Sequence, residues 1–427
     1  RTGIARSISC HEMGLPEKLP PLSVSVGGGS MSLEIDTRLR WEFMIYFDHA
    51  ATSFPKPKAV IEAVRQALET YAANPGRGTH ALAEKAASVI NDARREIALF
   101  FGLNDRQRVF FYQNATMALN QAIRGFPLKK GDHVIASSYE HNSIRRPLEL
   151  LKKEKIIDVS YLHVNEQGGF EYDRWLNEIR PNTKLIAVTH ASNLTGMIMP
   201  VEEIGQLARK KGIAFLVDAS QTAGILPIDM EKMNIDLLAF AGHKGLLGPQ
   251  GTGALLVRKG IELTPLIVGG TGSHSEARLN PDVLPDKFES GTLNTPGIAG
   301  LLAGIREVKR LTVENVFKHE AALAAYCIER LETINKVTVY GPKATTARLG
   351  VVAFEMEGID CHELAMILDQ HYNIAVRSGI HCTPLAHQSL GTIEKGLVRA
   401  SFGITNTKEE VERFISAIKE IKEIYIG

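Results

Sequence analysis

Cysteine is scarce in this chain, and no hydrophobic run is long. Only 4 cysteines occur among 427 residues, and none of them forms a CxxC pair or another metal-ligand spacing. This argues against a disulfide framework or a zinc site and favours a reducing cytoplasm. The longest apolar runs have the length of a strand, far short of the roughly 20 residues that cross a membrane, so we expect no membrane attachment.

An excess of charge of either sign is also absent. The 49 Lys and Arg residues balance 48 Asp and Glu residues to a net charge of +1, and no basic block is longer than a few residues. Nucleic-acid-binding proteins carry a basic patch, so we expect no nucleic-acid partner. The hydrophobic content of 44% is that of a globular protein, and the length predicts roughly two or three domains.

The first 43 residues differ from the rest. They include two adjacent prolines and a run of three glycines, but no continuous apolar segment of the kind that a secretory signal has. We interpret residues 1–43 as a flexible leader or a non-native extension, with Met44 as the natural start. A transit peptide is the alternative, because Arg1 and Arg6 lie in an opening without acidic residues.

Short β-like runs alternate with helical patterns over much of the chain. Apolar residues at helical spacing predict helices over 57–71, 82–101, 116–125, 142–154, 201–211, 297–311 and 316–334. Strands are expected over 45–47, 108–112, 133–137, 158–162, 185–190, 213–217, 236–241 and 254–257. This alternation predicts an α/β fold with a mostly parallel sheet covered by helices, followed by a C-terminal α+β region. Between 265 and 296 the periodicity fades into a long loop, and such loops are commonly functional.

Two neighbouring strand candidates end on polar residues. The run 213–217 is followed by Asp218, and the run 236–240 by Ala241-Gly242-His243-Lys244. Ligands of open α/β sheets bind at the carboxyl ends of the strands. A lysine there can form a Schiff base with an aldehyde cofactor, and an aspartate can keep a pyridine nitrogen protonated, as pyridoxal phosphate (PLP) needs. Taken alone, Lys244 fits a surface lysine and Asp218 a loop acid at least as well.

Ten motifs in a fixed order decide between these interpretations. They are Asp48–Thr52, Asn74–His80, Gln113–Thr116, Glu140–Ser143, Ala191–Gly196, Asp218–Gln221, Ala241–Lys244, Glu289–Thr292, Arg377–Cys382 and Val398–Ser401. From Ile45 to the C-terminus, this set resembles the class V aminotransferase family of fold-type I PLP enzymes. Within that family it is most similar to the branch of cysteine desulfurases and selenocysteine lyases.

The resemblance implies a two-domain architecture. The large, PLP-binding domain would span 59–300 and contain a seven-stranded, mostly parallel sheet covered by helices. The smaller α+β domain would combine 44–58 with 301–427.

The resemblance also implies how PLP is held at its ring. Lys244 would form the Schiff base, and Asp218 would pair with the pyridine nitrogen. His141 would stack on the ring and take part in proton transfer. Asn193 and Gln221 would lie near the ring hydroxyl.

The phosphate of PLP would lie at a helix N-terminus, where backbone N–H groups are free to bind anions. Ala115, Thr116 and His243 would hold it. Thr292 would reach the phosphate of the partner subunit in a homodimer. The family often has hydroxyl side chains at the positions of Ala115 and Ala241, so fewer hydroxyls would contact the phosphate here.

The substrate side of the site rests on the same resemblance. Arg399 would clamp the substrate carboxylate, which suits a planar bidentate donor. Arg377, Asn193 and His80 would line the substrate pocket, although His80 in its Gly-rich turn fits a solvated loop residue equally well. Cys382 would attack the substrate sulfur, because its polar and partly cationic neighbours favour a thiolate. Cys327 and Cys361 are interpreted as buried core residues.

The implied reaction is the PLP-dependent conversion of L-cysteine to L-alanine, without a metal. Sulfur would remain on Cys382 as a persulfide for an acceptor protein, as in iron–sulfur cluster assembly. A selenocysteine lyase acting on L-selenocysteine, a C–S β-lyase and an aminotransferase are alternatives on the same fold. A sulfur-delivery partner with little turnover is a further alternative, against which the intact Lys244 and Cys382 argue.

Overall fold

The computed structural model describes residues 44–76, 78–163 and 171–426. Seven strands form its large sheet in the order β2-β8-β7-β6-β5-β3-β4. They are β2 (Val109–Tyr112), β3 (Asp132–Ser137), β4 (Ile157–Leu162), β5 (Thr183–Thr189), β6 (Ala214–Asp218), β7 (Leu237–Ala241) and β8 (Gly253–Val257). Only β8 runs antiparallel to its neighbours, β2 and β7. The predicted seven-stranded, mostly parallel sheet is confirmed.

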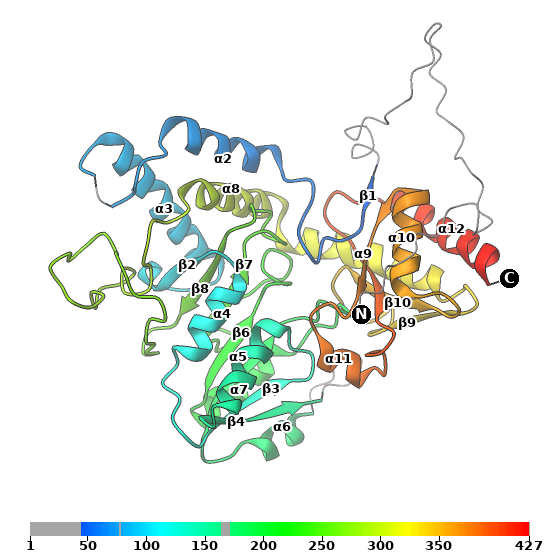
Figure 1. Cartoon of the computed structure of the whole chain (residues 1–427), viewed down its shortest axis with the longest axis horizontal. Coiled ribbons are helices and arrows are strands. Elements are labelled where there is room, and N and C mark those ends of the chain that lie inside the picture. The colour runs from blue at the N-terminus through cyan, green and yellow to red at the C-terminus, as the bar shows by residue number, and fades with distance from the viewer. Residues whose placement is uncertain (1–43, 77, 164–170, 427) are drawn as a thin grey trace, which may run out of the picture.

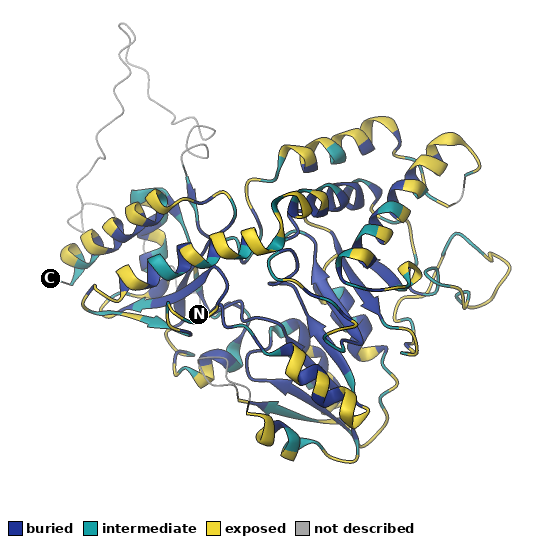
Figure 2. Ribbon diagram, turned by 180° about the vertical axis from the view of Figure 1, so that it is seen from behind, coloured by how far each residue is buried: buried dark blue, intermediate teal, exposed yellow. Residues whose placement is uncertain are grey.

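Helices cover both faces of this sheet (Figure 1). They are α3 (Ala81–Phe100), α4 (Ala115–Arg124), α5 (Asn142–Lys153), α6 (Tyr172–Glu178), α7 (Val201–Lys211) and α8 (Thr295–Leu311). Helix α2 (Lys58–Thr70) packs on the outside of α3 and α8. Alternate strand residues face opposite layers. On β6, Phe215 and Val217 belong to the core with α3, α7 and α8, whereas Leu216 belongs to the core with α4 and α5. Figure 2 shows the strands buried between helices whose outer faces are exposed.

The C-terminal part forms a separate antiparallel sheet in the order β12-β13-β10-β9. Its strands are β9 (Val337–Tyr340), β10 (Val351–Met356), β12 (Arg377–Gly379) and β13 (Leu397–Ser401), and β1 (Ile45–Tyr46) pairs in parallel with β11 (Ile374–Ala375). The helices here are α9 (Val313–Leu331), α10 (Cys361–Tyr372), α11 (Pro384–Ser389) and α12 (Lys408–Tyr425). The α+β character expected for this region is confirmed.

The N-terminal segment packs against these C-terminal elements. Phe47 is fully buried, and its ring meets those of Phe402 and Phe414 edge-on at 4.9 and 5.8 Å. This contact agrees with grouping 44–58 with 301–427, but the domain boundaries themselves stay a prediction. The interpretation of residues 1–43 lies outside the described residues. None of the helices described is both long and apolar enough for a membrane crossing.

The long loop between β8 and α8 has no helix or strand, as expected. It ends two residues earlier than predicted, because Asn294 caps α8 by accepting from the Gly297 N–H at 3.0 Å and Pro296 fits the first helical turn. The short elements α6, α11, β11 and β12 were not predicted. They have at most seven residues each, too few to establish a hydrophobic period.

A buried ion pair fastens the end of this loop to the large sheet. The Arg94 guanidinium on α3 donates to both carboxylate oxygens of Glu289 at 2.9 and 2.8 Å, and both side chains are nearly inaccessible. Glu289 also accepts from the backbone N–H of Phe111 on β2 at 2.7 Å. The guanidinium lies 4.9 Å from the centre of the Phe111 ring. Three segments therefore meet at one charge pair.

We expect Arg94→Met to destabilise the protein by about 3 to 5 kcal/mol, because it leaves the Glu289 carboxylate buried without its partner. The neighbouring Arg95 forms an exposed ion pair with Asp92, so Arg95→Met is the matched control and should change the stability by less than about 1 kcal/mol. Urea unfolding followed by circular dichroism measures both. Equal small effects would contradict a structural role for the buried pair.

Candidate active site

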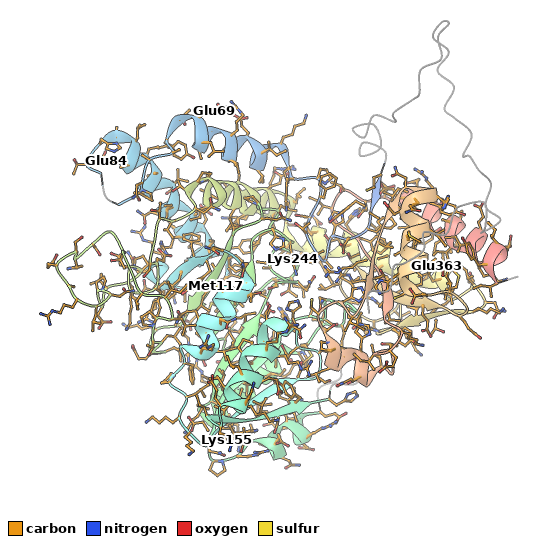
Figure 3. The ribbon with its side chains drawn as sticks, in the orientation of Figure 1. Glu69, Glu84, Met117, Lys155, Lys244 and Glu363 are labelled. Atoms are coloured by element: carbon orange, nitrogen blue, oxygen red, sulfur yellow. The ribbon has the colours of Figure 1, made fainter. Side chains whose placement is uncertain are left out.

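Most of the predicted site residues line one cavity of about 220 Å³. These are Ala115, Thr116, His141, Asn193, Asp218, Gln221, His243, Lys244, Arg377, Cys382 and Arg399. The cavity lies beyond the carboxyl ends of β3, β5, β6 and β7, where ligands of parallel sheets bind. Its other side is formed by β12, β13 and the loop before α11. Figure 3 shows Lys244 between the large sheet and the C-terminal elements.

Lys244 follows β7 in a tight loop. Gly242 has no room for a side chain, because a Cβ there would lie 2.3 Å from the Thr252 hydroxyl oxygen. The structure records no hydrogen bond or ion pair for the Lys244 ammonium within the described ranges. Burial lowers the pKa of Lys244 to about 8, an effect that Asp218 opposes and Arg399 and Arg377 reinforce. An amine with this pKa is available both as a nucleophile and as a base near neutral pH.

Asp218 ends β6 beside Lys244 and is buried. Its Oδ1 accepts from the backbone N–H and the hydroxyl of Ser220 at 2.9 and 2.5 Å. No partner of Oδ2 is recorded among the described residues. One carboxylate oxygen is therefore held in place while the other is available to a ligand in the cavity, as a pyridine nitrogen would require.

His141 precedes α5 and caps it. Its Nδ1 accepts from the backbone N–H of Ser143 at 3.0 Å. Burial lowers the pKa of His141 to about 4, against the influence of Asp218, so the ring is neutral at pH 7. Because Nδ1 accepts, the single ring proton is on Nε2. A neutral ring with a fixed tautomer can stack on a flat ligand and exchange a proton at Nε2.

A phosphate-sized anion has donors at the start of α4. Asn114 caps the Met117 N–H at 2.9 Å, which leaves the N–H groups of Ala115 and Thr116 free in the first helical turn. The Thr116 hydroxyl lies 2.7 Å from that of Ser143. Ser143 lines the same cavity, although no role was expected for it. The free lysine, the available carboxylate oxygen, the neutral imidazole and these donors together fit PLP.

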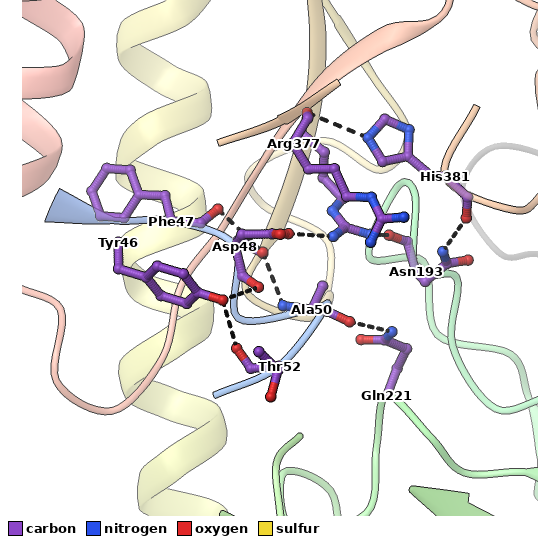
Figure 4. A network of polar contacts seen from close by, with 11 residues as sticks. Tyr46, Phe47, Asp48, Ala50, Thr52, Asn193, Gln221, Arg377 and His381 are labelled. Atoms are coloured by element: carbon purple, nitrogen blue, oxygen red, sulfur yellow. Dashed lines mark hydrogen bonds and ion pairs between the residues drawn. The ribbon is translucent and has the colours of Figure 1, made fainter. Parts of the chain in front are cut away.

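The Arg399 guanidinium forms hydrogen bonds within the protein. Its Nη2 lies 2.6 Å from Asp48 Oδ1, and its Nη1 donates to the Asn193 carbonyl at 2.9 Å, while its buried Nε has no partner. Figure 4 shows Asn193 donating to the His381 carbonyl at 2.7 Å. Arg377 lines the same cavity, and its exposed guanidinium has no recorded partner in the described chain. Asp48 begins the first of the ten motifs, but no pattern in the sequence predicts its contact with Arg399.

Cys382 lies in the loop between β12 and α11 and is half-buried. Both His381 and Cys382 have left-handed backbones, with φ of 54° and 60°, a conformation that costs about 1 to 2 kcal/mol per residue. The Asn142 N–H donates to the Cys382 carbonyl at 2.8 Å and ties the loop to the start of α5. Cys327 and Cys361 are buried, as expected, and burial raises the pKa of both thiols.

Two predicted residues lie outside this cavity. Thr292 lines a different cavity together with Asn74 and Gly76, and its contact with a partner subunit stays a prediction. His80 is exposed and caps α3 through the Ala83 N–H at 3.4 Å, so its role in the substrate pocket also stays a prediction. In the described parts of the chain, His, Cys, Asp and Glu side chains form no cluster of three or more suited to a metal.

The profile of the family "Aminotransferase class-V" matches residues 45–414. The chain belongs to this family. Family members depend on PLP, which agrees with the donor set of the cavity. The chain is 36% identical to a probable cysteine desulfurase of Pyrococcus abyssi, covering 88% of this chain and 94% of that protein. It is 32% identical to a cysteine desulfurase of Haloferax volcanii, with 90% of each chain covered.

Solved structures of this family have the same fold. The apo structure of a cysteine desulfurase from Thermococcus onnurineus superposes with a TM-score of 0.84 at 35% identity, covering 93% of this chain and all of that one. The cysteine desulfurase CsdA from Escherichia coli, in an S-sulfonic acid form, gives a TM-score of 0.82 at 26% identity, covering 91% and 99%. The resemblance of the ordered motifs and the expected fold are thus confirmed.

The lowered pKa of Lys244 predicts its reactivity. In the protein without PLP, modification of Lys244 by an amine-selective reagent should reach half its maximal rate near pH 8, whereas free lysine requires about pH 10.4. Peptide mass spectrometry over a pH series measures this and separates Lys244 from Lys56, whose pKa burial also lowers to about 8. A Lys244 that titrates like free lysine would contradict the electrostatics of the site.

Proposed function

We propose that this protein is a PLP-dependent cysteine desulfurase that converts L-cysteine to L-alanine and carries the sulfur as a persulfide on Cys382. The observation that carries the proposal is that Lys244 and Cys382, 138 positions apart in the chain, line the same cavity. Relatives described as cysteine desulfurases support it over nearly the whole chain. The free thiol at Cys382 requires a reducing compartment, so a cytoplasmic location is part of the proposal.

In this proposal Lys244 acts at the substrate Cα, and Asp218 acts at the pyridine nitrogen of PLP. PLP, when bound, supplies an electron sink for negative charge at the substrate Cα. Lys244 Nζ accepts the proton from Cα, for which its lowered pKa suits it. Asp218 Oδ2 would hold the ring nitrogen of PLP, and His141 would lie against the ring and move a proton at Nε2. The N–H groups of Ala115 and Thr116 would bind the phosphate.

Two arginines bind the substrate carboxylate. Arg377 is exposed at the cavity and has no recorded partner in the described ranges. An incoming carboxylate can therefore bind it without displacing an acidic side chain. Arg399 lies deeper and must share its guanidinium with Asp48. The carboxylate then uses the free N–H groups of Arg399, including the unpartnered Nε. Asp48 fixes the orientation of Arg399 before substrate arrives.

Sulfur transfer depends on a thiol that moves little. The carbonyls of His381 and Cys382 each accept a hydrogen bond, from Asn193 and from Asn142. The Cys382 thiolate attacks the substrate sulfur, the C–S bond breaks, and the released carbon skeleton is protonated to alanine. Because the loop is held at two points, an acceptor protein must approach Cys382. A homodimer in which Thr292 reaches the neighbouring site completes the proposal.

Replacing the thiol tests the sulfur step. Cys382→Ala should reduce alanine formation from L-cysteine at least 100-fold and leave the visible absorbance of bound PLP unchanged, because only the nucleophile is lost. Cys361→Ala, which removes a buried thiol outside the cavity, is the control and should keep its alanine production. Alanine release that survives in Cys382→Ala would overturn the persulfide step.

Replacing the lysine tests cofactor attachment. Lys244→Ala should lose both the visible absorbance of protein-bound PLP and alanine formation, whereas Lys58→Ala on the exposed start of α2 should keep both. Retained absorbance in Lys244→Ala would show that another lysine holds PLP.

Product analysis separates the proposal from its alternatives. Alanine from cysteine indicates a desulfurase, whereas a keto acid indicates an aminotransferase and pyruvate with free sulfide a β-lyase. Alanine from selenocysteine alone indicates a selenocysteine lyase. No turnover of either amino acid indicates a binding role in sulfur delivery.

A further inference from the structure

A second, smaller cavity lies behind Lys244. Its volume is about 30 Å³, and Ala50, Gln221 and Lys244 line both this cavity and the large one. The remaining walls come from the segment after β1, from α8 and α9, from β10 and from residues 401–405. Lys244 thus lies between the candidate active site and a second space that none of the proposed steps uses.

Glu320 on α9 is one wall of this space. Its side chain is only 5% exposed, and no hydrogen bond or ion pair is recorded for its carboxyl among the described residues. Gly350 packs directly on it, because a Cβ at Gly350 would lie 2.8 Å from the Glu320 Cβ. Burial raises the pKa of Glu320 to about 8, so the group is mostly protonated at neutral pH.

His49 is the second unpaired polar group at this cavity. Its Nε2 is buried and has no hydrogen-bond partner. The ring is fixed by edge-on contact with Tyr46 at 5.0 Å and by the close approach of Gly403. Burial, and secondarily Lys56, lower the pKa of His49 to about 4, so the ring is neutral. Together with Lys244, these are the titratable groups that line the cavity.

Unpaired buried polar groups need a partner, and this space has room for one. A buried acid or imidazole without a hydrogen bond costs on the order of 1 to 3 kcal/mol. A cavity of about 30 Å³ holds one or two waters, and a buried water needs two to four polar partners. Glu320, His49 and Lys244 supply such partners, and the buried apolar side chains of Val308 and Val316 form part of the wall.

We propose that this cavity binds water that links Glu320 to Lys244, and that Glu320 is a proton store acting through Lys244. The proposal rests on the proposed function, in which Lys244 moves protons at the substrate. The Oε–H bond of Glu320 breaks, a proton passes through the water, and an N–H bond forms on Lys244, leaving a carboxylate. Lys244 gives this proton to a substrate carbon, and the Glu320 carboxylate takes a proton from solvent water between turnovers, so the store is refilled and no electron is gained or lost.

The two groups are matched for such an exchange. Lys244 and Glu320 both have a pKa of about 8, so moving the proton between them requires little free energy in either direction. Lys244 can then deliver a proton to the substrate carbons without waiting for bulk solvent. Glu320 itself touches neither substrate nor PLP in this arrangement.

Glu320→Gln tests the proposal, because glutamine keeps the size and hydrogen bonding but holds no transferable proton. In the holoenzyme we expect kcat for alanine formation to fall about tenfold, KM to change little, and the pH profile of kcat near pH 8 to lose the part due to Glu320 and keep the part due to Lys244. Glu329→Gln, on the exposed side of the same helix, is the control and should match the native protein. An unaltered pH profile and kcat in Glu320→Gln would overturn the proposal.

A measurement without PLP distinguishes failure of this proposal from failure of the proposed function. Because the pKa of Glu320 is raised in the folded state, folding binds a proton between pH 4.5 and about 8, and stability contributed by the protonated acid is lost as pH rises through that window. Glu320→Gln should flatten this part of the stability profile, and it should remove an infrared band of a protonated carboxyl that titrates near pH 8.

If Glu320→Gln does not fold, the infrared titration of the native protein decides alone. A protonated carboxyl that ionises near pH 8 supports the role of Glu320 as a proton store. The absence of such a carboxyl overturns that role. If the native protein makes no alanine but shows this carboxyl, the proposed function is refuted, whereas the protonated state of Glu320 is confirmed. A crystal structure in which side chains fill the cavity without water would overturn the link to Lys244.

Discussion

The placement of a half-buried lysine beside a buried aspartate, after two adjacent parallel strands, is the constraint on which the rest of the structure depends. Asp218, the last residue of β6, lies opposite Ala239 of β7. The loop that follows β7 must therefore turn back for Lys244 to lie near Asp218. A buried ammonium is unfavourable unless charge surrounds it, and its pKa falls accordingly. The protein holds this loop rigidly, because the His243 carbonyl accepts from the Ser53 N–H and from the Lys56 ammonium.

The C-terminal sheet completes the site because it adds what the large sheet lacks. β13 contributes a deep guanidinium at Arg399, and the loop after β12 contributes the thiol at Cys382. Hydrogen bonds from Asn142 and Asn193 hold the left-handed backbone of this loop in place. The site therefore exists only where the two sheets meet.

Polar groups without partners gather around this meeting point. Besides the carboxyl of Glu320, they include His49 Nε2, Arg399 Nε and His381 Nδ1, all within the shell around Lys244. Native proteins leave few buried polar atoms unpaired. Around the candidate site our two proposals explain this feature: substrate and PLP would bind in the large cavity, and water would bind in the small one. In both cases the unsatisfied groups are available to ligands rather than to the protein.

The sequence by itself determined the order of helices and strands and the placement of Asp218 and Lys244 after two adjacent strands. Both depend on local periodicity and on the rule that ligands bind at strand ends. Motif order also predicted Cys382 and most of the other residues that line the large cavity. The tertiary structure alone decided the position of β8 between β2 and β7, the small cavity at Glu320, and the engagement of Arg399 by Asp48. Asp48 and Arg399 are 351 positions apart, and no local pattern links them, because their contact arises only from the packing of the N-terminal segment on β13.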